Sequence, residues 1–202
     1  MVALPGQQVP LHIFEHRYRE LVADLEGEDA LYDGFVIIPV IDGRLHGRGT
    51  FMRLQRVVRR YGSGELDIVT QAEQIVNVLE FDQEMDDKSY PGGIIGGNAV
   101  TYGPADDGLA KQLLDRVGTL LKALGAHRDL PAVNDQYFSF AIAIAVGLQL
   151  KEEVELIGID AEDDRLERLL ELCERNIKQA EQVLAVRRKV MMNGHFRYAR
   201  GS

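Results

Sequence analysis

The spacing of the apolar residues changes once along this chain, and that change constrains the fold more than any other feature. Before residue 86, apolar residues form short runs that turn residues interrupt every ~8–12 positions, which is typical of strands. From residue 106 onward they recur at three- and four-residue intervals, which is typical of helices packed on a core. We therefore predict an α+β protein, with a β-rich part over residues 1–90 and a helical part over residues 106–202.

Residues 91–105 separate the two parts. They contain Pro91-Gly92-Gly93 and Gly96-Gly97, which favour turns and irregular backbone. These glycines do not begin a phosphate-binding loop, because no Gly-Lys-Ser or Gly-Lys-Thr sequence follows them. We expect a flexible Gly/Pro-rich connection over this segment.

The β-rich part contains apolar runs of strand length. After the extended start at residues 10–13, the predicted strands cover residues 35–40, 47–58, 66–70 and 74–81. Asp42-Gly43 is a hairpin-turn pair, because these two residue types accept the positive φ that such a turn requires. One helix, over about residues 15–25, interrupts the strands. This pattern favours a small barrel or sandwich.

The helical part should contain four helices. The apolar spacing and the capping residues predict them over residues 106–124, 134–148 and 151–157, and from Asp160 for roughly 30 residues. The last helix carries a heptad-like row of Leu166, Leu170, Cys173, Ile177, Ala180 and Leu184. Packing of this row on the other helices is the favoured interpretation, and a homodimer through the same row is the alternative.

Residues 10–18 turn from an extended run into a helix. Phe14 stands at the corner and is expected to be buried there, and Glu15 should accept backbone N–H bonds of the first helical turn. His12 to His16 also match the H-x-x-E-H pattern of inverted zinc peptidases. Zinc needs both histidines one turn apart on a single helix, and here the helix begins only near Glu15. The two side chains should therefore diverge, and we predict no metal site.

Composition narrows the class of protein. Of the 202 residues, 46% are hydrophobic and 27% charged, so a packed core is expected. The net charge of −9 disfavours binding to nucleic acid. A single cysteine, Cys173, excludes an intramolecular disulfide and fits the cytoplasm. The sequence shows neither a signal peptide nor an apolar run of about 18 residues, so we expect no association with a membrane. It also shows no catalytic constellation and no cofactor motif, so we expect no cofactor.

Three segments in order resemble the Lon N-terminal (substrate-binding) domain family. Pro-Leu-His-Ile-Phe-Glu-His-Arg-Tyr at residues 10–18 is similar to the family signature P-L-x-I-F-E-x-R-Y. Gly49-Thr50, residues 64–69 and residues 79–81 resemble its β-subdomain, and residues 135–151 with residues 165–170 resemble its helical half. The resemblance implies a PUA-like β pseudo-barrel with one helix, followed by a helical bundle that ends in a long helix.

The resemblance also implies a function. It indicates a stand-alone, non-enzymatic module that binds unfolded or misfolded polypeptide, with a separate ATPase or protease as a partner. Neither the Walker motif nor the Ser-Lys dyad of Lon proteases occurs in the chain. Family members usually begin with a strand reading L-P-L-F-P-L, whereas residues 1–6 here match only the turn that follows it. We therefore expect a missing first strand and an open sheet edge.

The site residues follow from these interpretations. The substrate-binding candidates are Tyr90, Ile94, Ile95 and Tyr102, for which burial against the bundle is the alternative. The structural motif that should hold the first helix to the barrel is Phe14, Glu15, Arg17 and Tyr18. Two other functions remain open: a zinc-dependent peptidase that uses His12 and His16, and an RNA binder, because PUA-like barrels can bind RNA.

Overall fold

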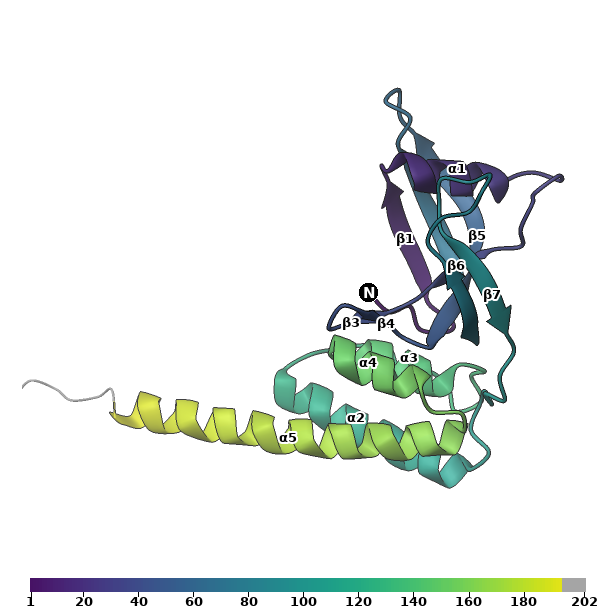
Figure 1. Cartoon of the computed structure of the whole chain (residues 1–202). Coiled ribbons are helices and arrows are strands. Elements are labelled where there is room, and N and C mark those ends of the chain that lie inside the picture. Colours follow the sequence, from purple (N-terminus) through teal and green to yellow (C-terminus); the bar gives the residue numbers. More distant parts are fainter. Residues whose placement is uncertain (194–202) are drawn as a thin grey trace, which may run out of the picture.

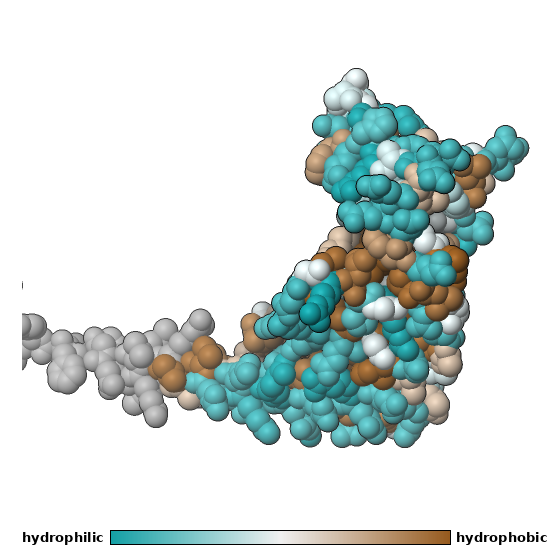
Figure 2. Space-filling model, in the orientation of Figure 1, coloured by the Kyte–Doolittle hydropathy of each residue, from teal (hydrophilic) through white to brown (hydrophobic). Residues whose placement is uncertain are grey.

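A β-sheet and a helical bundle make up the protein, one above the other in Figure 1. The computed structural model describes residues 1–193, and over residues 187–193 it describes the backbone alone. The strands and one helix come first in the chain and four helices follow, which confirms the α+β organisation. The last helix extends well past the others (Figure 1). On the face seen in Figure 2, hydrophobic residues gather where the sheet meets the helices.

The main sheet is antiparallel throughout. Its strands are β1 (Gln8–Ile13), β2 (Phe35–Ile37), β5 (Arg48–Arg60), β6 (Leu66–Asp82) and β7 (Gly92–Gly96). They lie in the order β1-β6-β5-β2, and β7 also pairs with β6. A small hairpin of β3 (Val40–Ile41) and β4 (Arg44–Leu45) turns at Asp42 and Gly43, whose φ angles are 50° and 77°. The predicted hairpin turn is confirmed.

Two predictions about the strands were wrong. Residues 66–82 form the single strand β6 rather than two, because β5 pairs along most of its length and three local register shifts absorb the irregularities. Residues 92–96 form β7 rather than irregular backbone. Ile94 and Ile95 are β-branched residues, which favour a strand. Gly93 allows the backbones of β7 and β6 to approach closely, since a Cβ at this position would lie 2.2 Å from the Glu80 carbonyl oxygen.

Helix α1 (His16–Asp24) packs on one end of the sheet. Val22, only 2% exposed, belongs to a small core with Leu66 and Ile68 of β6. At one end of the helix, Arg19 Nη1 donates to the carbonyl oxygen of Ser63 in the β5–β6 turn at 3.3 Å. At the other end, Lys88 Nζ donates to Asp24 Oδ2 at 2.7 Å. These contacts hold α1 to the sheet.

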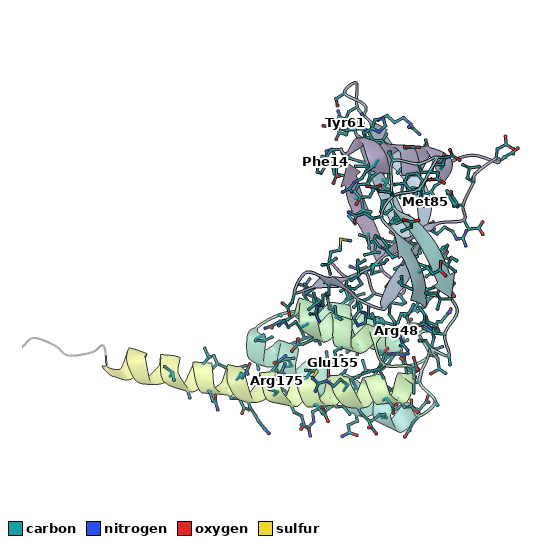
Figure 3. All side chains as sticks on the ribbon, viewed as in Figure 1. Phe14, Arg48, Tyr61, Met85, Glu155 and Arg175 are labelled. Carbon is teal, nitrogen blue, oxygen red and sulfur yellow. The ribbon has the colours of Figure 1, made fainter. Side chains whose placement is uncertain are left out.

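The prediction that Phe14 is buried was wrong. Its exposed fraction is 62%, and it lies beside α1 at the outer end of the sheet, away from the helical bundle (Figure 3). Strand parity explains this: Val9, Leu11 and Ile13 are the more buried residues along β1, so Phe14 continues the outward row and stacks on His12 at 6.3 Å between ring centroids.

The other residues of that corner make local contacts. Glu15 occupies the N-cap position of α1, but its side chain caps no backbone N–H, so that prediction was also wrong. Its carboxylate instead pairs with Arg17 at 2.8 Å. The Arg17 guanidinium lies 4.7 Å from the centre of the Tyr18 ring. Arg19, rather than Arg17, reaches across to the β5–β6 turn.

The four helices of the bundle are α2 (Asp107–Leu124), α3 (Phe138–Val146), α4 (Leu150–Ile157) and α5 (Glu162–Asn193). Asp106 Oδ1 accepts from the Gly108 N–H at 2.7 Å, and Gly125 ends α2 in the left-handed conformation at φ 65°. These two ends agree with the helix predicted over residues 106–124. The core of the bundle includes Ala110, Leu113, Val117, Leu120, Phe138, Phe140, Ile142, Leu156, Leu166, Leu169 and Cys173.

The heptad-like row of α5 is only partly covered. Leu166 and Cys173 are fully buried in the core that α5 shares with α2. Leu184, two turns after Ile177, is 38% exposed, because the long helix has by then run past its neighbours. Packing within the bundle therefore explains the first half of the row and not the second.

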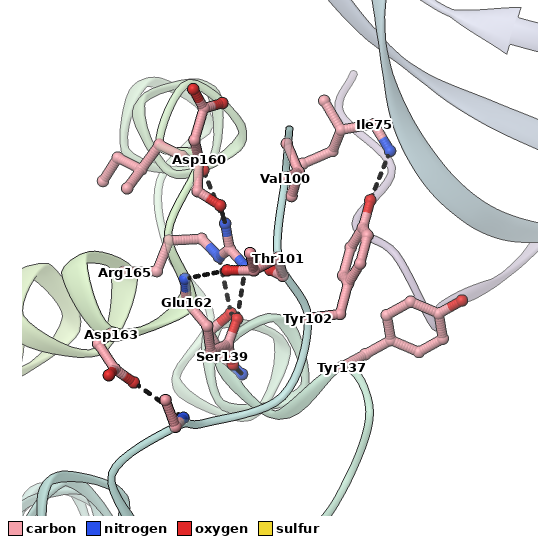
Figure 4. Close-up of polar contacts among 12 residues, drawn as sticks. Ile75, Val100, Thr101, Tyr102, Tyr137, Ser139, Asp160, Glu162, Asp163 and Arg165 are labelled. Carbon is pink, nitrogen blue, oxygen red and sulfur yellow. Dashed lines mark hydrogen bonds and ion pairs between the residues drawn. The ribbon is translucent and has the colours of Figure 1, made fainter. Parts of the chain in front are cut away.

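A buried ion pair ties the segment before α2 to α3 and α5 (Figure 4). Arg165 is fully buried and Glu162 is 2% exposed, and their side chains pair at 2.5 Å. The guanidinium also donates to Ser139 Oγ at 3.1 Å and to the carbonyl oxygen of Thr101. Glu162 in turn accepts from the backbone N–H and the hydroxyl of Ser139, both at 2.8 Å.

The sheet and the bundle are joined by polar contacts. Arg48 of β5 pairs with Asp160 at 2.7 Å and donates to the carbonyl oxygens of Ile157 and Gly158, at the C-terminal end of α4. On β6, the backbone N–H of Ile75 donates to Tyr102 Oη at 3.0 Å (Figure 4). Both contacts reach across the junction, so they help to fix the sheet relative to the bundle.

Candidate functional site

The outer end of β6 and the whole of β7 form a two-stranded ribbon, which we call the β6–β7 ribbon (residues 77–82 and 92–96). β1 pairs with β6 only as far as Gln71, and β5 only as far as Asn77. β7 pairs with this end of the strand, from Asn77 opposite Gly96 to Asp82 opposite Gly92. On the other side, the last backbone hydrogen bond runs from the Val78 N–H to the Gly47 carbonyl oxygen, at 2.9 Å, and beyond it the strand pairs with β7 alone. No third strand in the described part of the chain continues the sheet there.

Four large apolar side chains of the ribbon are exposed. Leu79 and Phe81 of β6 are 62% and 42% exposed, and Ile94 and Ile95 of β7 are 53% and 42% exposed. Leu79 lies over β7, since a Cβ added at Gly96 would come within 3.0 Å of it. By the strand pairing, Leu79 and Ile94 lie on one face of the ribbon and Phe81 and Ile95 on the other. The protein's own core covers neither pair.

Acidic residues lie beside these apolar side chains. Glu80 and Asp82 alternate with Phe81 along β6, and Glu84 follows in the next turn; all three are exposed. The flanking charge would attract cationic groups on a ligand and repel anionic ones.

Ile94 and Ile95 were candidates from the sequence, whereas Leu79 and Phe81 were not. The sequence placed residues 74–81 on a strand of the sheet, where apolar residues are usually covered. The alternation of Leu79 and Phe81 with acidic residues was the available signal. It could not show that the neighbouring strands stop short of them.

The two candidate tyrosines lie elsewhere and are largely buried. Tyr90 is 4% exposed, and its hydroxyl donates to Asp24 Oδ2 at 2.5 Å. Burial and this carboxylate both raise the pKa of Tyr90. Tyr102 packs between the sheet and the bundle against Tyr137, with ring centroids 5.5 Å apart, and burial raises the pKa of Tyr102. Neither ring joins the surface of the β6–β7 ribbon.

The sequence matches one protein family over most of its length. Residues 1–175 match the family described as the ATP-dependent protease La (LON) substrate-binding domain. The chain belongs to this family. A search of curated proteins found no match to the sequence.

Solved structures of Lon N-terminal domains share this fold. A Lon N-terminal domain protein from Xanthomonas campestris is 22% identical, with a TM-score of 0.60 over 84% of this chain and 91% of that one. The N-terminal domain of a Lon protease from the Mycobacterium avium complex is 16% identical, with a TM-score of 0.59 over 86% of this chain and 92% of that one. The expected resemblance to the Lon N-terminal domain fold is confirmed.

The histidines of the H-x-x-E-H pattern belong to different elements of this Lon-type domain. His12 lies on β1, where its Nδ1 is 2.7 Å from Asp67 Oδ1, and His16 is the first residue of α1. Tyr61 Oη also donates to Asp67, at 2.6 Å, and these hydrogen bonds lower the pKa of the Asp67 carboxyl. Within residues 1–193, no three potential metal ligands cluster together.

Two shallow hollows also open on the surface. One, of about 450 Å³, lies between β6 and the start of α3 and is lined by Gln71, Ala72, Glu73, Gln74, Tyr102, Gln136 and Tyr137. The other, of about 320 Å³, lies between the β3–β4 hairpin and α4 and includes His46, Lys151 and Glu155. Neither adjoins the four apolar side chains of the β6–β7 ribbon.

Among the described helices, none is both long enough and apolar enough to cross a membrane.

Proposed function

We propose that this chain is a polypeptide-binding module and that it contacts its substrates through the β6–β7 ribbon. The exposure of Leu79, Phe81, Ile94 and Ile95 carries the proposal. Unfolded polypeptides expose apolar side chains, which such a surface can cover. The family's description as a substrate-binding domain of an ATP-dependent protease supports the same class of ligand.

The apolar contact by itself supports only weak binding. Full burial of one side chain of this size contributes ~1.5–3 kcal/mol, and these four are already about half buried, so the gross gain is on the order of 3–6 kcal/mol. Micromolar affinity requires about 8 kcal/mol, after ordering costs are met. Single segments should therefore bind weakly unless other contacts contribute.

We further propose that the module binds without cleaving, in the cytoplasm, and that a separate ATPase or protease processes what it holds. The family description names a binding role within an ATP-dependent protease, which fits this division of labour. Cys173, the one cysteine of the chain, is buried and unpaired, as suits a reducing compartment. The acidic net charge of −9 favours polypeptide over RNA as the ligand.

Binding of a fluorescently labelled, permanently unfolded protein tests the proposal. The double variant Phe81→Thr/Ile94→Thr keeps strand-forming residues but removes apolar surface, and should weaken binding at least fivefold. Val58→Thr is the matched control, because Val58 is 58% exposed on β5, outside the ribbon. Equal affinity of all three proteins would place binding elsewhere. No binding up to about 1 millimolar, which corresponds to about 4 kcal/mol, would remove the proposed function itself.

A homodimer through the outer part of α5 is a second candidate. Val183, Leu184 and Val186 are 52%, 38% and 59% exposed on a helical stretch that projects beyond the bundle (Figure 1). Sedimentation over a range of concentrations tests this: association should appear in the unaltered chain and disappear in Leu184→Glu. A monomer at every concentration would rule the dimer out.

A further inference from the structure

We infer that a bound polypeptide adds to the free edge of β7 as an extended strand. The inference rests on the proposed function, since it specifies how the β6–β7 ribbon would hold its substrate. β7 pairs with β6 on one side, and no backbone hydrogen bond joins it to any other segment within residues 1–193. Its second edge is therefore open.

The direction of the backbone groups can be followed from β6 outward. The N–H of Ile75 donates to Tyr102 Oη, and its carbonyl oxygen accepts from Asn98 Nδ2 at 2.7 Å. Both groups thus point away from β5, toward the side of the strand on which β7 lies. Asn77, two residues later, points the same way and meets Gly96.

The alternation then assigns the groups of β7. Because Gly96 faces β6, its neighbour Ile95 presents its N–H and carbonyl to the open edge. Ile94 faces β6 again, and Gly93 faces outward. The bulge opposite them is in β6, between Val78 and Glu80, so it does not disturb this alternation along β7. Two residues, Gly93 and Ile95, therefore offer a donor and an acceptor each.

The open edge lacks the devices that usually protect one. Exposed edge strands commonly carry a lysine, a proline or an inward-pointing charge that prevents further pairing. β7 reads Gly-Gly-Ile-Ile-Gly, without a charge or a proline. Its glycines leave room beside the edge, and the adjacent residues Ile94 and Ile95 point to opposite faces. An added strand would have an isoleucine on each face near its own side chains.

The surroundings indicate which extended segments fit. Added strands bind through main-chain hydrogen bonds, and their alternate side chains supply specificity. Apolar side chains on one face of the added strand can contact Ile95. The other face carries Ile94 together with the exposed Glu80 and Asp82, whose charge favours lysine or arginine at the alternate positions of the added strand. The ligand is accordingly an extended, unfolded segment that alternates apolar and basic residues.

Backbone methylation of a ligand distinguishes strand addition from apolar contact alone. The probe is a fluorescent Lys-Val-Lys-Val-Lys-Val-Lys peptide, and its affinity for the full chain is measured by anisotropy. Two further peptides carry N-methyl groups on the odd or on the even amides, so that each loses the hydrogen-bond donors of one edge and keeps every side chain. We expect at least one methylated peptide to bind tenfold more weakly than the parent or worse.

Hydrogen exchange gives a readout on the protein side. Saturating parent peptide should slow exchange of the Gly93 and Ile95 amide protons at least fivefold, while the Ile94 amide, which already faces β6, changes less. Binding of both methylated peptides within twofold of the parent, or unchanged exchange at Gly93 and Ile95, would overturn strand addition and leave the proposed function standing. Failure of the parent peptide and of the unfolded protein to bind would overturn both.

Discussion

The buried pair of Arg165 and Glu162 offers the sharpest test of how this fold is held together. Replacing Arg165 by Met keeps a long apolar stem but removes the guanidinium. Glu162, 2% exposed, would then be a buried carboxylate left, among the described residues, with Ser139 as its hydrogen-bond partner. The carbonyl oxygens of Thr101, Ile159 and Asp160 would each lose a donor as well.

The size of the effect follows from the missing partner. Breaking a buried ion pair by removing one member costs ~3–5 kcal/mol, because an uncompensated charge remains. For a chain of this length, 1 kcal/mol corresponds to ~2–4 °C in the melting temperature, so a decrease of about 6–20 °C is expected. Arg175→Met, which removes a half-exposed arginine of the same helix, should cost at most about 1 kcal/mol.

Urea unfolding of the two variants measures the difference. The double variant Glu162→Leu/Arg165→Met should recover much of the loss, because it leaves no unpaired charge inside the bundle. If Arg165→Met destabilises the protein no more than Arg175→Met does, the buried pair does not hold the bundle and the reasoning fails.

Three further predictions concern single residues. Phe14→Ala should lower the free energy of unfolding by at most about 2 kcal/mol, since the residue is 62% exposed and the same substitution at a fully buried site costs ~3–5 kcal/mol. A loss above about 3 kcal/mol would contradict its exposure. Burial raises the pKa of the Cys173 thiol to about 11, so a thiol reagent at about pH 8 should modify the native protein far more slowly than the urea-unfolded one, and equal rates would refute its burial. The hydrogen bond from Lys88, with that from Tyr90, holds the pKa of Asp24 below its ordinary value of 3.8. The ionised carboxylate therefore stabilises the fold at pH values above 3.8, and this stabilisation is lost as the pH falls through the pKa of Asp24 in the folded protein. Asp24→Asn should make the free energy of unfolding depend less on pH in the acid range. An unchanged pH dependence would contradict the role assigned to Asp24.

Much of the fold could be predicted because its signals are local. The cap at Asp106, the stop at Gly125 and the turn at Asp42-Gly43 each depend on the conformations that a few adjacent residues can adopt. The apolar spacing likewise distinguished the β-rich part from the helical part. The family signature at residues 10–18 added the arrangement of those parts.

The errors arose where the outcome depends on distant partners. Phe14 looked like a buried ring because it is large and apolar, but the parity of β1, set by its pairing with β6, turns it outward. The break expected between residues 70 and 74 disappeared because β5 pairs across it. The Gly-rich segment became β7 because β6 continued far enough to pair with it.

The candidate site shows the same division. Local patterns were enough to predict an α+β chain of the Lon substrate-binding type and to select Ile94 and Ile95 as candidates. Their position with Leu79 and Phe81 on an uncovered ribbon with a free edge became evident from the folded chain. The exposure of a side chain depends on where the neighbouring strands end. Here the pairing of β6 with β1 ends at Gln71 and its pairing with β5 ends at Asn77, the first residue of the ribbon.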